Sequence, residues 1–399
     1  MNRNKLISIL TMCTLSTQVL IAEDFNQFLK QAIEKSPYLQ SSKIEVEQAQ
    51  KLASKQIRYT NPSLEIGYSQ YKPEDANTKN GYSISLSKDI QLWSTIQDNE
   101  SVSNNMLNNA NNTYSQNRAA FIRDISLYYT TYAQEKKFLQ LGEKSLDIAK
   151  TINDISKKRY EVGSISKSDI LQSQVAYLNV VAQNKELELN SMESYYDLLQ
   201  FSGIDNEISI DIMHNFKFKP LDTISQNPEL LSILSQQELI QAQANLDSNS
   251  IESVTLNGSY SQEPDQTVSG VSLSIPLVLF NNKNEEKSIA RLEKNKSALL
   301  ALKKKTSLKN EMSKLLEKRN YLLDLKMKYN NIISLNNTLL EMYFEKYRIS
   351  KATILEIQDI QNKVIETTKN LIKTETALNQ NAIYLDYIQG GYNEKNITN

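Results

Sequence analysis

The chain has 399 residues, a formal net charge of −1, one His and one Cys. A charge this balanced leaves no basic excess of the kind that binds nucleic acid. A single His and a single Cys also exclude a His/Cys metal centre and a His-based catalytic triad within one chain, and no Gly-rich phosphate loop is present. We therefore expect no enzyme, and hence no catalytic residues, no metal and no cofactor.

Residues 1–22 have the pattern of a secretory signal peptide. Arg3 and Lys5 make the start positive, an apolar run follows, and Ala22 precedes acidic Glu23 and Asp24. An uncleaved membrane anchor is the alternative, although the run is short and is diluted by several Thr and Ser residues. Cleavage removes two of the 45 basic and none of the 46 acidic residues, which leaves a net charge of −3 and no Cys. We expect an exported protein without disulfides.

Two long segments have the composition of helices. Residues 92–201 and 281–389 contain no Pro, and Gly142 and Gly163 are their only glycines. Their apolar residues recur every three or four positions, and in the second segment Leu and Tyr follow a seven-residue repeat typical of a coiled coil. After residue 22 no segment is apolar enough for a membrane-spanning helix, so a membrane location would require β-strands.

Four short segments, at about 62–71, 82–90, 254–262 and 269–279, alternate apolar and polar residues. Period-two alternation with Ser on one side suits a barrel wall whose apolar side chains face lipid. A half-buried soluble hairpin has the same alternation, and the pattern taken alone favours that alternative.

The two halves of the chain match each other at a nearly constant spacing, which is strong evidence for an internal duplication. The offset is 191 residues before the first hairpin loop and 187 after it, as in the pairs Pro37 and Pro228, Gly67 and Gly258, Tyr160 and Tyr347, Asp169 and Glu356, and Gly203 and Gly390. The expected organisation is a first repeat at 23–203 with its tip at 163, a linker or equatorial segment at 204–227, a second repeat at 228–391 with its tip at 350, and a short tail at 392–399.

Four strands are too few to close a barrel, and open sheet edges cannot face lipid. Several copies in a symmetric ring would solve this problem. The helix from Trp93 to about Arg159 would reach roughly 100 Å at 1.5 Å per residue, several times the thickness of a bilayer. An exported protein with this plan fits a conduit across the periplasm.

The turn sequence "RYEVGSISKSDILQ" and the strand end "VSLSIPL" resemble those of the TolC-like outer-membrane efflux proteins, the outer-membrane factors of tripartite pumps. The resemblance implies a mainly α fold with a small β part: a long α-helical coiled-coil barrel plus a trimeric, twelve-stranded outer-membrane β-barrel with four strands per chain. It implies a channel-tunnel of a tripartite efflux or secretion system, which carries substrate through a gated trimeric pore. The expected location is the outer membrane of a Gram-negative-type cell, with the tunnel extending into the periplasm.

The resemblance also implies the partners: two further copies of the chain, a periplasmic adaptor (membrane fusion) protein, an inner-membrane RND or ABC pump, and outer-membrane lipid, but no nucleic acid. A soluble periplasmic coiled-coil protein that bridges partners is the alternative reading.

The hairpin tips are the candidate adaptor-docking surface. Gly163 would supply the positive φ of the first turn, and Ser166 would cap the next helix. In the second turn Ser350 replaces the glycine usual in the family, which leaves its geometry open. The docking candidates are Arg159, Tyr160, Val162, Gly163, Ser166, Ile349, Ser350 and Thr353.

Glu356 and Asp359 occupy the positions at which the family narrows its tunnel, so the resemblance implies an acidic, cation-attracting pore constriction. Two acidic residues three positions apart can also be a solvated helix face. The resemblance further implies a gate latch that involves Asp169 and Tyr347. Ala352 stands where an Arg often completes that latch, and Lys351 is adjacent, so we expect a weaker or differently wired latch.

Overall fold

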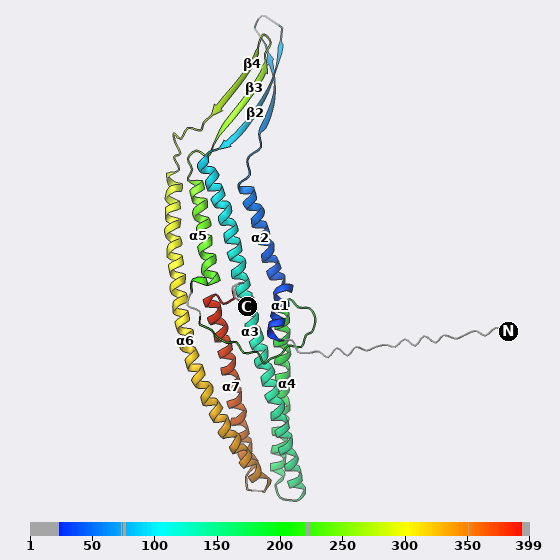
Figure 1. Ribbon diagram of the computed structural model, residues 1–399. Coiled ribbons are helices and arrows are strands. Elements are labelled where there is room, and N and C mark those ends of the chain that lie inside the picture. Colours follow the sequence, from blue (N-terminus) through cyan, green and yellow to red (C-terminus); the bar gives the residue numbers. More distant parts are fainter. Residues whose placement is uncertain (1–23, 73, 75–76, 221–223, 350, 393–399) are drawn as a thin grey trace, which may run out of the picture.

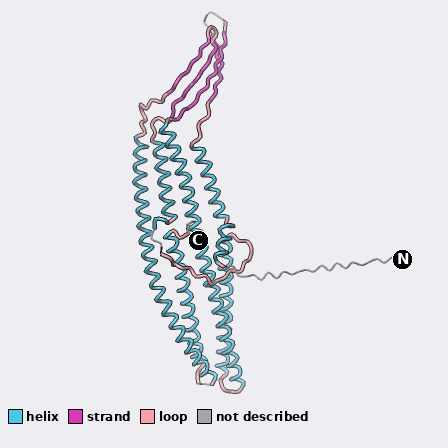
Figure 2. Tube along the Cα trace, viewed as in Figure 1, coloured by secondary structure: helices cyan, strands magenta, loops and turns pink. Residues whose placement is uncertain are grey.

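The computed structural model describes residues 24–392 except residues 73, 75, 76, 221–223 and 350. The expected signal peptide, Ser350 and the tail beyond residue 392 therefore lie outside the described residues. The described chain is elongated, with a β-sheet at one end and long helices over the rest of its length (Figures 1 and 2).

The first half contains α1 (Phe25–Lys35), α2 (Pro37–Gln56), β1 (Ser63–Tyr71), β2 (Lys79–Gln91), α3 (Trp93–Glu161) and α4 (Lys167–Ser202). After a single 3-10 turn, η1 (Ile224–Gln226), the second half contains α5 (Pro228–Asp247), β3 (Ser253–Gln262), β4 (Thr267–Ser274), α6 (Asn284–Arg348) and α7 (Ile354–Gln389). The expectation of a mainly α fold with a small β part is confirmed. Among the helices of the described residues, none is both long enough and apolar enough to cross a membrane.

Corresponding elements of the two halves have matching lengths and ends. Helices α2 and α5 both have 20 residues and start with Pro, and α4 and α7 both have 36 residues and start with a capping box. Both of the latter end at a glycine with positive φ, Gly203 at 73° and Gly390 at 77°. A Cβ on Gly390 would collide with the carbonyl group of Gln226. A residue larger than glycine is therefore excluded at this position both by this collision and by the positive φ. The halves are thus two copies of one structural plan.

The four strands form one antiparallel sheet in the order β1-β2-β3-β4. One face carries rows of apolar residues, such as Ile66, Ile84 and Tyr260 in adjacent strands, and the other carries Ser rows, such as Ser85 opposite Ser259. Strand β4 ends at Ser274, so the expected strand end at 279 is wrong. Pro276 has no N–H group to donate to the neighbouring strand, which accounts for the early end.

The helices lie side by side in one layer (Figure 1). Helix α3 packs against α2 and α4 on one side and against α5 and α7 on the other, and α6 packs against α5 and α7. The order across the layer is therefore α2/α4, α3, α5/α7 and α6.

A second, smaller layer covers one face of these helices near the middle of the molecule. Phe25 and Phe28 of α1 pack against Tyr129 of α3, together with Ile210 and Phe216 of the segment that follows α4. The hydroxyl of Tyr129 donates to the carbonyl of Asp211 at 2.7 Å, which pins this segment to α3. The largest apolar core of the described chain lies here.

Candidate functional site at the helical tips

The first hairpin tip is built by local backbone chemistry. Gly163 has φ 72°, and added side-chain atoms would meet nothing nearby, so the turn needs glycine for its backbone angle and not for space. Ser166 and Asp169 then form a reciprocal capping box. The Asp169 carboxylate accepts from the Ser166 N–H at 2.9 Å and from its hydroxyl at 2.8 Å. These hydrogen bonds, the backbone one first, lower the pKa of Asp169.

The second tip repeats the same cap with different residues. The Glu356 carboxylate accepts from the Thr353 N–H at 2.7 Å and from its hydroxyl at 2.9 Å, and these bonds lower the pKa of Glu356. One turn further along α7, Asp359 forms an ion pair with Lys363 at 2.6 Å. Both acidic residues are exposed in the single chain, whereas their neighbours Ile357 and Ile360 are buried.

A cluster that we call the tip clamp joins the two hairpins and consists of Ser156, Arg159 and Tyr347. The Tyr347 side chain is only 2% exposed, and its hydroxyl lies 2.7 Å from Oγ of Ser156. Because the Ser156 hydroxyl already donates to the carbonyl of Ile152, the Tyr347 hydroxyl is the donor. The Arg159 guanidinium lies over the Tyr347 ring and donates to the Tyr347 carbonyl at 3.1 Å.

The clamp is embedded in apolar contacts between the ends of α3, α6 and α7. Ile152, Ile354 and Ile357 are buried around Tyr347, and Ala352 packs at the edge of this cluster. The tips of the two hairpins therefore move apart only if an apolar cluster, a cation–π contact and two hydrogen bonds are all broken.

The expected site residues are divided between these two arrangements. Asp169 and Tyr347 form their hydrogen bonds with different partners, Ser166 and Ser156, so within the described chain no hydrogen bond joins them. Arg159, expected only as a docking residue, is in the clamp. Val162 and Ile349, by contrast, are largely exposed at the tips, and Tyr160 is 43% exposed.

Sequence reasoning missed the clamp because Arg159 and Tyr347 belong to different repeats. Its only signal in the sequence is the presence of a long cation and an aromatic residue near matching turns. Within the described ranges, no group of three His, Cys, Asp or Glu side chains is arranged to hold a metal ion.

The sequence of the first repeat matches a known family. Residues 28–203 match the family model of the outer membrane efflux proteins. This region is therefore similar in sequence to the outer membrane efflux proteins. The matched region spans α2, both strands of the first hairpin, and the α3–α4 tip, which is the part that carries the turn motif. No curated protein sequence gives a significant match to the chain.

Three solved outer-membrane proteins, two of them described as channels, have the same fold as the described chain. The CmeC outer membrane channel of Campylobacter jejuni is 15% identical with a TM-score of 0.74, and the match covers 93% of this chain and 86% of that one. The outer membrane protein VceC of Vibrio cholerae is 14% identical with a TM-score of 0.75, with 92% and 95% covered. The open state of the MtrE outer membrane channel of Neisseria gonorrhoeae is 10% identical with a TM-score of 0.76, with 92% and 88% covered.

Proposed function

We propose that this protein is the outer-membrane channel-tunnel of a tripartite efflux or secretion system and works as a homotrimer. One observation carries the proposal: the described chain leaves an apolar sheet face, two unpaired sheet edges and two apolar helix edges uncovered. All of these surfaces find partners if copies of the chain close into a ring in a membrane.

The sheet is the part that meets lipid in this proposal. Its apolar face is uncovered, with Ile66 76% exposed and Val271 82% exposed, while Ser side chains line the opposite face. Strands β1 and β4 each have one neighbour, so each leaves a row of backbone groups without a partner strand. In lipid such edges must pair, and β4 of one copy can pair with β1 of the next.

The helix layer has the same property at both of its edges. Helix α6 exposes an apolar stripe at helical spacing, namely Tyr321, Leu325, Ile332, Leu335, Leu339 and Met342. Helix α4, at the other edge, exposes Leu171, Val175, Leu178, Leu189, Met192 and Tyr196. Stripes of this length normally face another helix.

The duplication indicates how these two edges meet. The 187-residue offset relates α3 to α6 and α4 to α7, so the contact of α3 with α7 inside the chain has a counterpart between α6 of one copy and α4 of the next. A ring built this way is continuous, because the α6–α4 contact between copies repeats the α3–α7 contact within each chain. The family resemblance supports three copies, which would give a twelve-stranded barrel and a helical tunnel.

The tips would then serve as gate and docking surface. In the ring, Glu356 and Asp359 of three copies would line a narrow acidic constriction that favours cations. Asp169 and the tip clamp would hold the closed state, and the exposed side chains of Tyr160, Val162 and Ile349 would meet the periplasmic adaptor. The adaptor would connect the tunnel to an RND or ABC pump in the inner membrane.

Reconstitution tests this proposal. The purified mature protein should migrate on unheated gels as a trimer that resists mild detergent, should become a monomer on boiling, and should give discrete conductance steps in planar bilayers. A protein that is monomeric, dissolves freely without detergent and gives no conductance would contradict the channel and favour a periplasmic bridging protein.

A further inference from the structure

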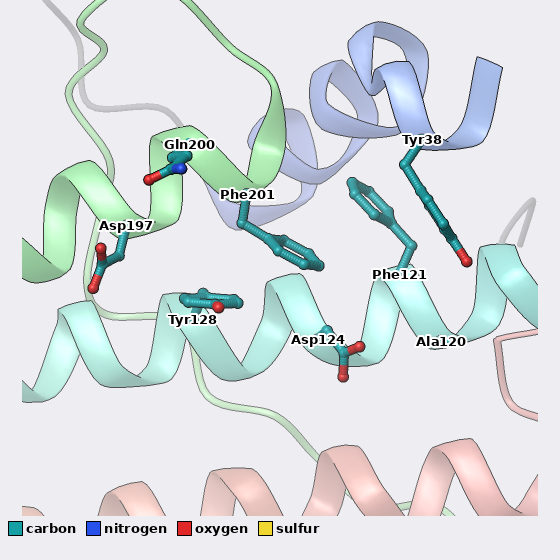
Figure 3. A pocket seen from close by; sticks show the side chains of 8 residues that line it. All are labelled: Tyr38, Ala120, Phe121, Asp124, Tyr128, Asp197, Gln200 and Phe201. Atoms are coloured by element: carbon teal, nitrogen blue, oxygen red, sulfur yellow. The ribbon is translucent and has the colours of Figure 1, made fainter. Parts of the chain in front are cut away.

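A cavity of about 480 Å³ lies where α2 and α4 meet alongside α3, and we call it the equatorial cavity. Its wall contains Tyr38 of α2, Phe121, Asp124 and Tyr128 of α3, and Asp197 and Phe201 of α4 (Figure 3). None of these residues lies at the tips or in the sheet. Tyr38 lies on α2, and Asp197 and Phe201 lie on α4, the two helices at that edge of the layer.

The aromatic side chains of this cavity form a ladder. The Phe201 ring stacks on Tyr128 with centroids 4.7 Å apart and on Phe121 with centroids 5.3 Å apart (Figure 3). The Tyr128 side chain is 39% exposed and Tyr38 is more exposed still, so aromatic faces remain uncovered. An uncovered aromatic ladder is a surface on which a flat apolar molecule can stack.

The charge of the cavity is negative. Both carboxylate oxygens of Asp124 accept from the Arg123 guanidinium, at 2.7 and 3.0 Å, so that charge is balanced. Asp197 is exposed and forms no hydrogen bond or ion pair with the residues that the structure describes. No Lys or Arg lines the cavity. A free carboxylate beside exposed aromatic faces is the combination that attracts an organic cation, through Coulomb attraction and cation–π contact together.

The cavity opens away from the layer formed by α1 and the segment after α4. That layer packs on the face of α3 that contains Ile125 and Tyr129. Asp124 and Tyr128 each precede one of these residues in the sequence, so their side chains are rotated about the helix axis by about 100° from that face. Tyr38, Tyr128 and Asp197 are exposed, so the cavity is open to solvent in the single chain.

In the proposed ring this open face is the inner one. Twelve helix positions at about 9 Å spacing enclose a lumen of roughly 25 Å. Three copies of α1, each about 10 Å across with its side chains, would block a lumen of that width, so the α1 layer belongs outside. The equatorial cavity then faces the path that a transported molecule takes.

We propose that the equatorial cavity binds flat aromatic organic cations, with the ring system against the uncovered face of Tyr128 and the positive charge near Asp197. The luminal position rests on the proposed function, whereas the binding chemistry rests on the cavity alone.

A matched pair of probes tests the cation preference. Binding of N-methylacridinium, a permanent flat cation, is compared at pH 8 with binding of neutral acridine, by fluorescence titration of the mature protein in lipid nanodiscs against empty nanodiscs. We expect Asp197→Asn to weaken binding of the cation about fivefold and to leave acridine unchanged, and Tyr128→Leu to weaken binding of both probes. Glu193→Gln, which removes an exposed carboxylate one turn away on α4, is the control and should behave as the wild type.

Equal binding of the cation to the wild-type protein, Asp197→Asn and Tyr128→Leu would overturn the inference, as would equal affinity for the two probes. The same preparations are examined for trimer migration and conductance. A trimeric, conducting protein without cation preference defeats this inference alone, whereas a monomeric, non-conducting protein defeats the proposed function and the luminal position with it.

Discussion

The guanidinium carbon of Arg159 lies 4.7 Å from the centroid of the Tyr347 ring, although the two residues belong to different repeats. The same guanidinium also donates to the Tyr347 carbonyl, so the Arg159 side chain contacts both the aromatic ring and the backbone of the other hairpin. This places a polar link between the hairpins at their tips, where the proposed channel is narrowest.

Removing this link should loosen the tips. In Arg159→Leu the cation–π contact and one hydrogen bond are lost, together worth about 1 kcal/mol, so the open population should rise about fivefold. Single-channel recording in planar bilayers measures the fraction of time spent at high conductance. Lys158→Ala, which removes an exposed neighbouring cation, is the control, and an equal effect of both changes would contradict a specific role for Arg159.

Asp169 can act through its local cap or through a latch to another helix, and two variants separate these roles. Ser166→Ala breaks the capping box but keeps the carboxylate, whereas Asp169→Ala removes both. If the carboxylate takes part in the latch, conductance should increase more in Asp169→Ala than in Ser166→Ala. Equal conductance in the two variants would show that Asp169 acts only as part of the helix cap and takes no part in the latch.

The acidic constriction can be neutralised without breaking the second cap. Gln replaces Glu in a capping box, so Glu356→Gln should keep the start of α7 and remove three charges from the proposed ring. The cation-to-anion permeability ratio, measured from the reversal potential in a salt gradient, should fall, and Asp359→Asn should lower it further. Glu345→Gln changes an exposed carboxylate on α6 near the tip and serves as control. A ratio that stays the same in all variants would place Glu356 and Asp359 outside the pore.

The pH dependence of stability should carry a contribution from Asp386 near the end of α7. Burial raises the pKa of Asp386 to about 7, against the smaller opposing effect of Arg319 and Lys219. The folded chain therefore holds this proton at a pH where the unfolded chain, with a pKa of about 3.9, has lost it. The free energy of unfolding should fall as pH rises from about 4 to about 7 and then level off.

Asp386→Asn should remove this slope and make the protein more stable than the wild type at pH 8, by about 2 kcal/mol. Denaturant midpoints of both proteins between pH 4 and pH 8 measure it. Because burial lowers the pKa of His214, that residue destabilises the fold at acidic pH in both proteins, and its effect cancels in their difference. A difference that does not change with pH would contradict the raised pKa.

Features set by local chemistry could be predicted from the sequence. The positive φ of Gly163 and the cap of Ser166 with Asp169 depend on residues within one turn, and the alternation of apolar residues located all four strands. The end of β4 was misplaced, because the apolar pattern continues past Pro276 although a proline cannot continue the ladder.

Features set by packing between distant segments could not be predicted. The Arg159–Tyr347 contact exists only because the two hairpins lie side by side, and a cation and an aromatic residue near matching turns do not by themselves predict it. The equatorial cavity likewise needs Tyr38, Tyr128 and Phe201 from three helices, each of which taken alone has the pattern of ordinary helix packing.

The central claim is that α6 of one copy packs against α4 of the next and closes a ring of three. Within the chain, Gln361 of α7 donates to the carbonyl of Ser145 of α3, and the offset of 187 carries this pair to Gln174 and Ile332. Because Cys13, in the expected signal peptide, is the only Cys of the chain, the double variant Gln174→Cys, Ile332→Cys can be treated with a short bismaleimide and analysed on denaturing gels. We predict covalent dimers and trimers and nothing larger, and none from either single variant. Monomers alone, or a ladder that continues past the trimer, would contradict the ring.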